Sequence, residues 1–217
     1  MAFSNFKAFT DISKRYNIKI ITEELVEKLM VIEPNPYFLE DLKMSQRFRK
    51  TASSEFFYCE HYIAPFLRYA LRKYTEFNLW SHEITLSADE NLNGMPDYVV
   101  SYVHNKSFEV FTPPYIAVAG AKKENFDEGW AQGLATALAC QMENKHPEIP
   151  VYVIVTTGIS WEIGFLKEKT LRKHAYSYNA LTHPSEVLGL LDFVFNECDK
   201  NIKQAVEEGK IDAETNY

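Results

Sequence analysis

The spacing of apolar residues along the first third of the chain predicts helices. Thr22 followed by two glutamates is typical of a capped helix start, so we expect a short helix over residues 23–30. A second helix is expected over residues 38–49. Apolar residues then recur at helical spacing over residues 55–74, where Pro65 is expected to kink or divide a longer helix.

Shorter apolar runs in the middle of the chain predict strands instead. Residues 82–87 and 98–103 are each expected to form a strand, with turns at residues 91–94 and 105–106. Residues 115–119 are apolar without interruption, which is typical of a central strand buried on both faces. The pattern therefore predicts three strands in succession.

The second half of the chain returns to helix and then strand. Asn125, with Glu128 three residues later, matches a capping box, and we expect the helix that it opens to run to about residue 142. Buried strands are expected over residues 151–155 and 161–166. Because a tight turn joins these two strands, we expect them to be antiparallel.

A final helix over residues 185–208, ended by Gly209, completes the predicted order of elements. The order is helix, three strands, helix, two strands and helix, so the predicted fold is α/β with a mixed sheet flanked by helices. Residues 53–217 are expected to form this domain. Residues 1–52 are expected to be a helical N-terminal extension rather than a domain of their own.

Composition places the chain among ordinary soluble proteins, with 46% hydrophobic and 24% charged residues. No apolar run approaches the length of a membrane span and no signal peptide is recognisable, so no membrane partner is expected. The three cysteines lack CxxC spacing and are interpreted as buried thiols in a reducing cytoplasm.

The net charge of −7 excludes a globally basic nucleic-acid-binding protein. Basic residues nonetheless gather locally, and the ordinary interpretation of each group is a solvated helix face or loop. The groups are Lys43, Arg47, Arg49 and Lys50, then Arg68, Arg72 and Lys73, and then Lys167, Lys169, Arg172, Lys173 and His174.

Two residues at predicted strand ends suggest chemistry on a phosphodiester. Asp97 begins one predicted strand and Lys122 follows the next, so a carboxylate and a cation can face each other. Metal-dependent hydrolysis needs carboxylates to hold the ion and a cation to stabilise developing negative charge. The plainer alternatives are that Asp97 shapes a turn and that Lys122 is solvated.

Five segments of the chain together carry a family resemblance. Residues 94–97 read Gly-Met-Pro-Asp, residues 118–123 are an apolar strand ending in Gly-Ala-Lys-Lys, and residues 129–132 read Gly-Trp-Ala-Gln. A glutamate ten residues before Pro-Phe-Leu lies within residues 55–67, and residues 151–161 end in Thr-Gly and then Trp. Together these segments resemble the PD-(D/E)XK nuclease superfamily over roughly residues 53–166.

The resemblance implies a restriction-endonuclease-like αβββαβ core that hydrolyses DNA with the help of Mg²⁺. It implies that Asp97 is a metal ligand together with the main-chain carbonyl of Ala121. It also implies that Lys122 stabilises charge, that Gln132 orients groups in the site, and that Glu55 is a supporting acid.

One position departs from the family pattern, because Gly120 stands where the second metal-binding acid is expected. In one interpretation Glu55, Glu124 or Glu128 replaces that acid, although the last two also suit the first turn of a helix. In the other, the domain does not cut and is a nucleic-acid-binding or scaffolding protein. A homodimer or a larger defence or repair assembly is then a further expectation.

Overall fold

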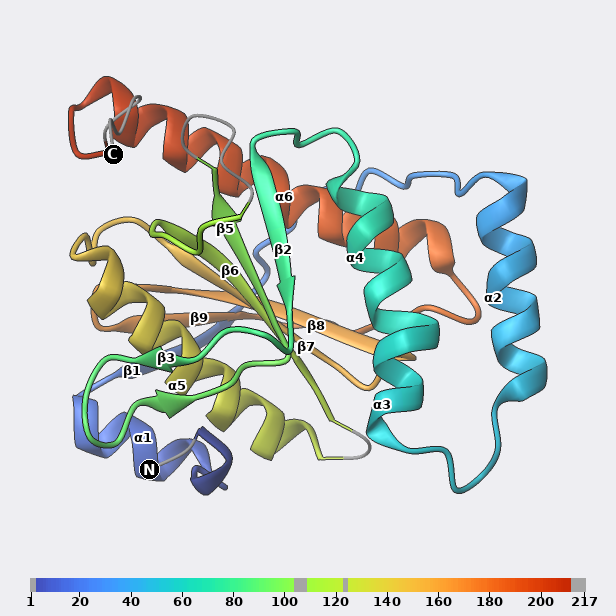
Figure 1. Cartoon of the computed structure of the whole chain (residues 1–217), viewed down its shortest axis with the longest axis horizontal. Coiled ribbons are helices and arrows are strands. Elements are labelled where there is room, and N and C mark those ends of the chain that lie inside the picture. Colours follow the sequence, from blue (N-terminus) through green and yellow to red (C-terminus); the bar gives the residue numbers. More distant parts are fainter. Residues whose placement is uncertain (1–2, 104–108, 123–124, 212–217) are drawn as a thin grey trace.

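An eight-stranded mixed sheet spans the molecule, and helices pack on both of its faces (Figure 1). The computed structural model describes residues 3–103, 109–122 and 125–211. The strands of the sheet are β1 (Lys19–Glu23), β2 (Phe77–Ser81), β5 (Tyr98–Tyr102), β6 (Tyr115–Ala121), β7 (Val151–Thr156), β8 (Ser160–Lys167), β9 (Thr170–His174) and β10 (Tyr178–Asn179). A separate hairpin consists of β3 (Leu86–Ser87) and β4 (Asn93–Gly94).

The strand order explains how distant segments meet. Along the sheet it is β1, β9, β8, β7, β6, β5, β2, and β10 pairs with β8. β2, β5 and β6 form an antiparallel meander, whereas β7 is parallel to β6 and antiparallel to β8. Two adjacent parallel strands need a crossover connection, and the helix α5 (Phe126–Asn144) provides it between β6 and β7. The α/β class with a mixed sheet flanked by helices is therefore confirmed.

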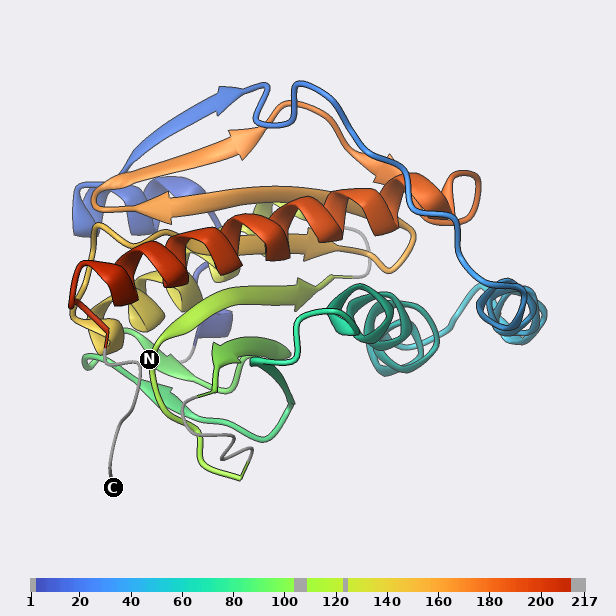
Figure 2. The same cartoon turned by 90° about the horizontal axis from the view of Figure 1, so that it is seen from above.

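Helices cover the sheet from two sides (Figure 2). They are α1 (Phe9–Tyr16), α2 (Pro36–Phe48), α3 (Glu55–Tyr58), α4 (Ala64–Leu71), α5 (Phe126–Asn144) and α6 (Pro184–Glu207), with a 3₁₀ turn η1 (Phe3–Asn5) and a π-helical turn η2 (Cys59–Ile63). On one face Trp130 of α5 packs in the same cluster as Val153 of β7. On the other, Phe66 of α4 and Leu191 of α6 pack with Ile154. The alternation of Val153 and Ile154 between the faces is the two-residue period of a strand.

Several predicted elements form where they were expected. The capping role of Asn125 is confirmed, since its Oδ1 accepts from the Glu128 N–H at 3.2 Å. The helix expected over residues 55–74 forms as α3, the π-helical turn Cys59–Ile63 and α4. The backbone stays helical from one element to the next, so the π-helical turn interrupts the regular α-helical pattern just before Pro65 without dividing the helix. Pro65 is the second residue of α4 and directly follows the π-helical turn, and it has no N–H to donate to that turn. Gly209 follows α6 with a φ of 67°.

The predicted helix over residues 23–30 is wrong. The preceding Lys19–Glu23 segment is the strand β1, which pairs in parallel with β9 at the edge of the sheet. Its isoleucines and threonine favour a strand, and Thr22 belongs to that strand instead of capping a helix. The first 52 residues therefore contribute a strand as well as helices, and the boundary expected after residue 52 remains a prediction.

Two further differences concern strands. Of the strand expected over residues 82–87, only Leu86–Ser87 forms one, as β3 in the separate hairpin. The neighbouring strand of the large sheet lies earlier, as β2, and ends before His82, which has a φ of 53°. β9 was not expected at all. The turn predicted at residues 105–106 lies outside the described residues.

The cysteines agree with a simpler expectation. The three cysteines are free and buried, as predicted. Within the described ranges, every helix is too short or too polar to cross a membrane.

Candidate functional site

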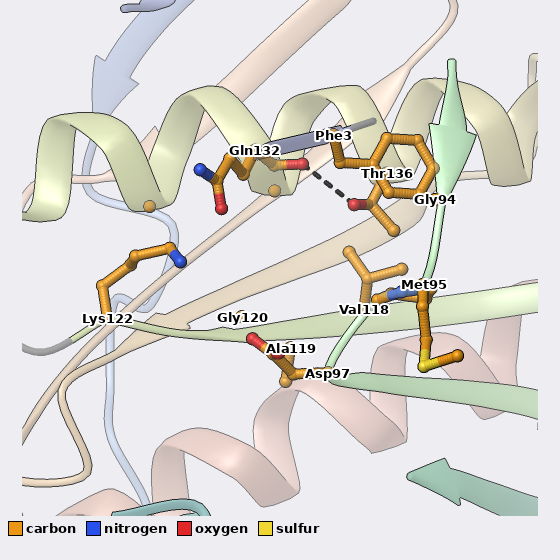
Figure 3. A pocket seen from close by; sticks show the side chains of 13 residues that line it. Phe3, Gly94, Met95, Asp97, Val118, Ala119, Gly120, Lys122, Gln132 and Thr136 are labelled. Carbon is orange, nitrogen blue, oxygen red and sulfur yellow. Dashed lines mark hydrogen bonds between the residues drawn. The ribbon is translucent and has the colours of Figure 1, made fainter. Parts of the chain in front are cut away.

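A pocket of about 300 Å³ opens at one end of β6, beneath α5 (Figure 3). Its walls come from the segment before β5, from the end of β6 and from one face of α5, and Phe3 closes one side. Three of the predicted site residues line it, namely Asp97, Lys122 and Gln132. Sheet register explains the first two, because Tyr98 pairs with Ala119, so the residue before β5 reaches the end of β6.

Asp97 is held by two donors. Its Oδ2 accepts a hydrogen bond from the main-chain N–H of Ala121 at 2.7 Å. Its Oδ1 lies 3.5 Å from Nε2 of His82. The main-chain N–H of His82 also donates to the Asp97 carbonyl at 3.0 Å, so the two residues are joined twice. The carboxylate is thus fixed in orientation at the floor of the pocket.

Lys122 and Glu55 form an ion pair. Lys122 follows β6, where its main-chain N–H donates to the Thr156 carbonyl at 2.9 Å. Its Nζ lies 3.6 Å from Oε1 of Glu55, the first residue of α3. The Lys122 side chain is 20% exposed and that of Glu55 is 42% exposed, so the pair stands at the mouth of the pocket. Such a half-exposed pair adds little stability, which leaves the ammonium free to meet an anion.

Gln132 and Glu128 lie one turn apart on α5, and a hydrogen bond joins their side chains. Gln132 Nε2 donates to Glu128 Oε1 at 2.9 Å, and Lys7 Nζ lies 2.6 Å from the same oxygen. The bond from Lys7 lowers the pKa of Glu128 below its ordinary value. The Glu128 carboxylate therefore already interacts with Lys7 and Gln132. Glu128 also does not line the pocket. Glu124 lies outside the described residues.

Gly120 lines the pocket between Asp97 and Lys122, and nothing in the packing requires a glycine there (Figure 3). A Cβ built on Gly120 meets no atom within 4 Å. Gly129 on α5 is the opposite case, since its Cβ would lie 2.6 Å from Cγ1 of Val155. Gly129 is needed for the close approach of α5 to the sheet, whereas position 120 has room for a side chain directed into the pocket.

His82 is a site residue that sequence reasoning missed. The hydrogen bond with Asp97 raises the pKa of His82 above its ordinary value, although partial burial acts in the opposite direction. The ring of Phe56 lies 5.9 Å from the His82 ring. No spacing in the sequence links positions 82 and 97, because they meet only through the pairing of Ser81 with Tyr98.

The residues of this pocket fit a Mg²⁺ ion poorly. Mg²⁺ prefers several oxygen ligands, usually one or two of them carboxylates. Asp97 supplies one carboxylate, and a main-chain N–H already occupies one of its oxygens. The expected role of the Ala121 carbonyl as a ligand remains a prediction.

Comparison of the chain with protein-family models, with curated proteins and with solved structures gave no match. The family resemblance therefore rests on the sequence segments themselves. Function has to be argued from the chemistry of the site, since a fold alone does not define one.

Proposed function

We propose that the protein is a restriction-endonuclease-like domain that binds DNA at this pocket and that glycine at position 120 disables its hydrolysis. One observation carries the proposal. Asp97, Lys122 and Gln132, which come from three different elements, line a single pocket in which Gly120 leaves an open position. A pocket that brings together Asp97, Lys122 and Gln132 but lacks the second carboxylate is what a disabled nuclease centre requires.

The order of elements supports the same proposal. A helix (α4), three antiparallel strands (β2, β5 and β6), a crossover helix (α5) and a strand parallel to the third (β7) follow one another. This is the αβββαβ order that the resemblance implies. The proposal adds that these elements are the nuclease-like core, with β8 to β10 and β1 extending the sheet.

Each group of the pocket has a role in holding a strand of DNA. Lys122 is the cation that meets a backbone phosphate, and Glu55 orients it through their 3.6 Å contact. Gln132, held by Glu128, offers an amide to the same strand. A Mg²⁺ ion would supply Lewis-acid chemistry to such a centre, and it would need a second carboxylate besides Asp97 to hold it well.

The alternative in which another acid replaces the missing one has limited support. Glu55 is the described carboxylate nearest to Lys122, and its contact with Lys122 suits an ion pair better than a metal ligand. A homodimer or a defence or repair assembly remains a separate hypothesis. The three free cysteines support a further proposal, a reducing location such as the cytoplasm.

Measuring DNA binding under conditions that prevent metal-dependent cleavage tests the proposed function. Fluorescence anisotropy would measure the affinity for a labelled DNA duplex that carries a single-stranded tail, in EDTA. Lys122→Met should weaken binding a few-fold. It should also reduce the slope of log affinity against log salt concentration by about one, as expected for the loss of one phosphate contact. Lys14→Met, on the exposed face of α1, is the matched control and should bind like the wild type. Equal affinity of the Lys122 variant and the wild type would contradict the proposal.

A further inference from the structure

α2, α3 and α4 form a helical arm (residues 36–73) along one side of the sheet. Figures 1 and 2 both place α2 on the outside of this arm, at the opposite end of the molecule from α1. α2 is anchored by Phe38, whose ring lies 4.9 Å from that of Phe66 and 4.8 Å from that of Tyr69. Its other faces are exposed.

The helical arm is basic, although the protein is acidic. Residues 36–73 contain seven Lys or Arg and four Asp or Glu residues, a net charge of +3, whereas the whole chain carries −7. The remainder of the chain therefore carries −10. A local positive potential on an acidic protein directs an anionic partner to one place on its surface.

Most of these cations are free to meet a partner. Lys73 is paired with Asp192, but in the described part of the chain no ion pair involves the other six. By contrast, Lys200 and Lys203 of α6 are each paired within their own helix. The six exposed cations of the arm are Lys43, Arg47, Arg49, Lys50, Arg68 and Arg72.

Exposed aromatic side chains are interleaved with these cations. Tyr37 is 83% exposed, Phe48 53% and Phe56 73%, and Met44 is also exposed. Tyr37, Met44 and Phe48 lie seven and four residues apart, so they form one line along α2. Exposing large apolar groups to water is unfavourable, which indicates that this line serves a partner.

A groove of about 440 Å³ lies between α2 and α4 and combines both kinds of group. Tyr37 and Tyr69 line it together with Arg68 and Arg72, and Asp41 is the acidic residue among its walls. The Arg72 guanidinium carbon lies 4.3 Å from the centroid of the Tyr69 ring. The groove thus offers flat π surfaces and guanidinium groups side by side.

We infer that the helical arm binds a single-stranded segment of DNA and leads it to the pocket. Bases would stack on Tyr37, Phe48 and Phe56, and phosphates would contact the free cations between them. A strand of nucleic acid supplies phosphates for the six cations and flat bases for the exposed aromatic rings, so one partner satisfies both kinds of group. Phe56 follows Glu55, the partner of Lys122, so the strand reaches the pocket mouth directly.

The inference rests on the proposed function and is tested in EDTA, so that cleavage plays no part. A labelled single-stranded oligonucleotide, the matching duplex and the same strand as RNA would be compared by anisotropy. The wild type should bind the single strand more tightly than the duplex. The aromatic variant Tyr37→Ala/Phe56→Ala should lose about fivefold or more in affinity. The charge variant Arg47→Glu/Arg49→Glu should lose tenfold or more and show a smaller salt slope.

Matched variants outside the arm give the controls. Tyr176→Ala removes a tyrosine that is 56% exposed on a loop after β9, and Lys14→Glu reverses an exposed charge on α1. Both should bind like the wild type. Arm variants that bind like the wild type, a preference for duplex or RNA, or self-association of the protein through the arm would each overturn the inference. If the arm variants lose affinity for DNA while Lys122→Met binds like the wild type, the arm is supported as the docking surface and the proposed function of the pocket is contradicted.

Discussion

The carboxylate of Asp97 accepts a hydrogen bond from the main-chain N–H of Ala121, with 2.7 Å between nitrogen and Oδ2. The bond ties the residue before β5 to the last residue of β6. Ala121 is 1% exposed, so its N–H depends on the Asp97 carboxylate for an acceptor in the folded protein. Asp97 is therefore a structural residue as well as the carboxylate of the pocket.

This bond predicts different stabilities for two variants of Asp97. Asp97→Ala leaves the buried Ala121 N–H without an acceptor and should lower the free energy of unfolding by about 1–3 kcal/mol. Asp97→Asn keeps a side-chain oxygen in the same place and should lose less. Urea denaturation of the wild type and both variants measures the difference. Equal losses for Ala and Asn would show that the hydrogen bond contributes nothing.

The two glycines at the pocket predict opposite effects of an added methyl group. Gly120→Ala meets open space and restricts the unfolded chain, so it should raise the free energy of unfolding by about 0.4–1 kcal/mol. Gly129→Ala places its methyl 2.6 Å from Val155 Cγ1 and should destabilise by about 1–3 kcal/mol. Thermal and urea unfolding of the pair test this. A destabilised Gly120→Ala would mean that position 120 requires glycine for folding.

His174 on β9 predicts a pH dependence of stability. Burial lowers the pKa of His174 below its ordinary value of 6.5, and its Nδ1 accepts from the Leu25 N–H at 3.0 Å. The unfolded chain therefore takes up a proton first as the pH falls. This histidine's contribution is full above pH 6.5, falls as the pH decreases through 6.5, and levels off below the folded pKa.

Comparison with His174→Gln isolates this effect from the other histidines. The stability difference between wild type and variant should be largest at about pH 8 and should shrink at about pH 5. Urea denaturation across this range measures it. A difference that stays constant or grows toward acid pH would show that His174 is not buried in its neutral form.

The sequence predicts the centre of the fold better than its edge. β6 was predictable because residues 115–119 are apolar without interruption, and α5 because Asn125 caps it. β9 was missed because Arg172 and Lys173 make it look like a solvated loop. Lys173 is accommodated in the sheet because its Nζ lies 4.3 Å from the Trp130 ring and 3.7 Å from Glu162, contacts that exist only after folding.

The same limit applies to the candidate site. Asp97, Lys122 and Gln132 line one pocket, and this could be expected because local sequence pattern predicts the two strand ends and the helix face that carry them. The pairing of His82 with Asp97 depends on the end of β2, which the sequence placed several residues too late. The occupation of Glu128 by Lys7 joins positions 121 residues apart, and no local pattern shows it.

The most direct measurement is nicking of supercoiled plasmid by Gly120→Glu in the presence of Mg²⁺ or Mn²⁺. Gly120→Gln matches its size without the charge, and Gly120→Glu/Lys122→Met removes the cation; circular dichroism would check that each variant is folded. The account predicts metal-dependent nicking by Gly120→Glu alone and none by the wild type, the glutamine variant or the double variant. A folded Gly120→Glu that neither nicks DNA nor binds the metal in calorimetry, or a wild type that nicks on its own, would contradict it.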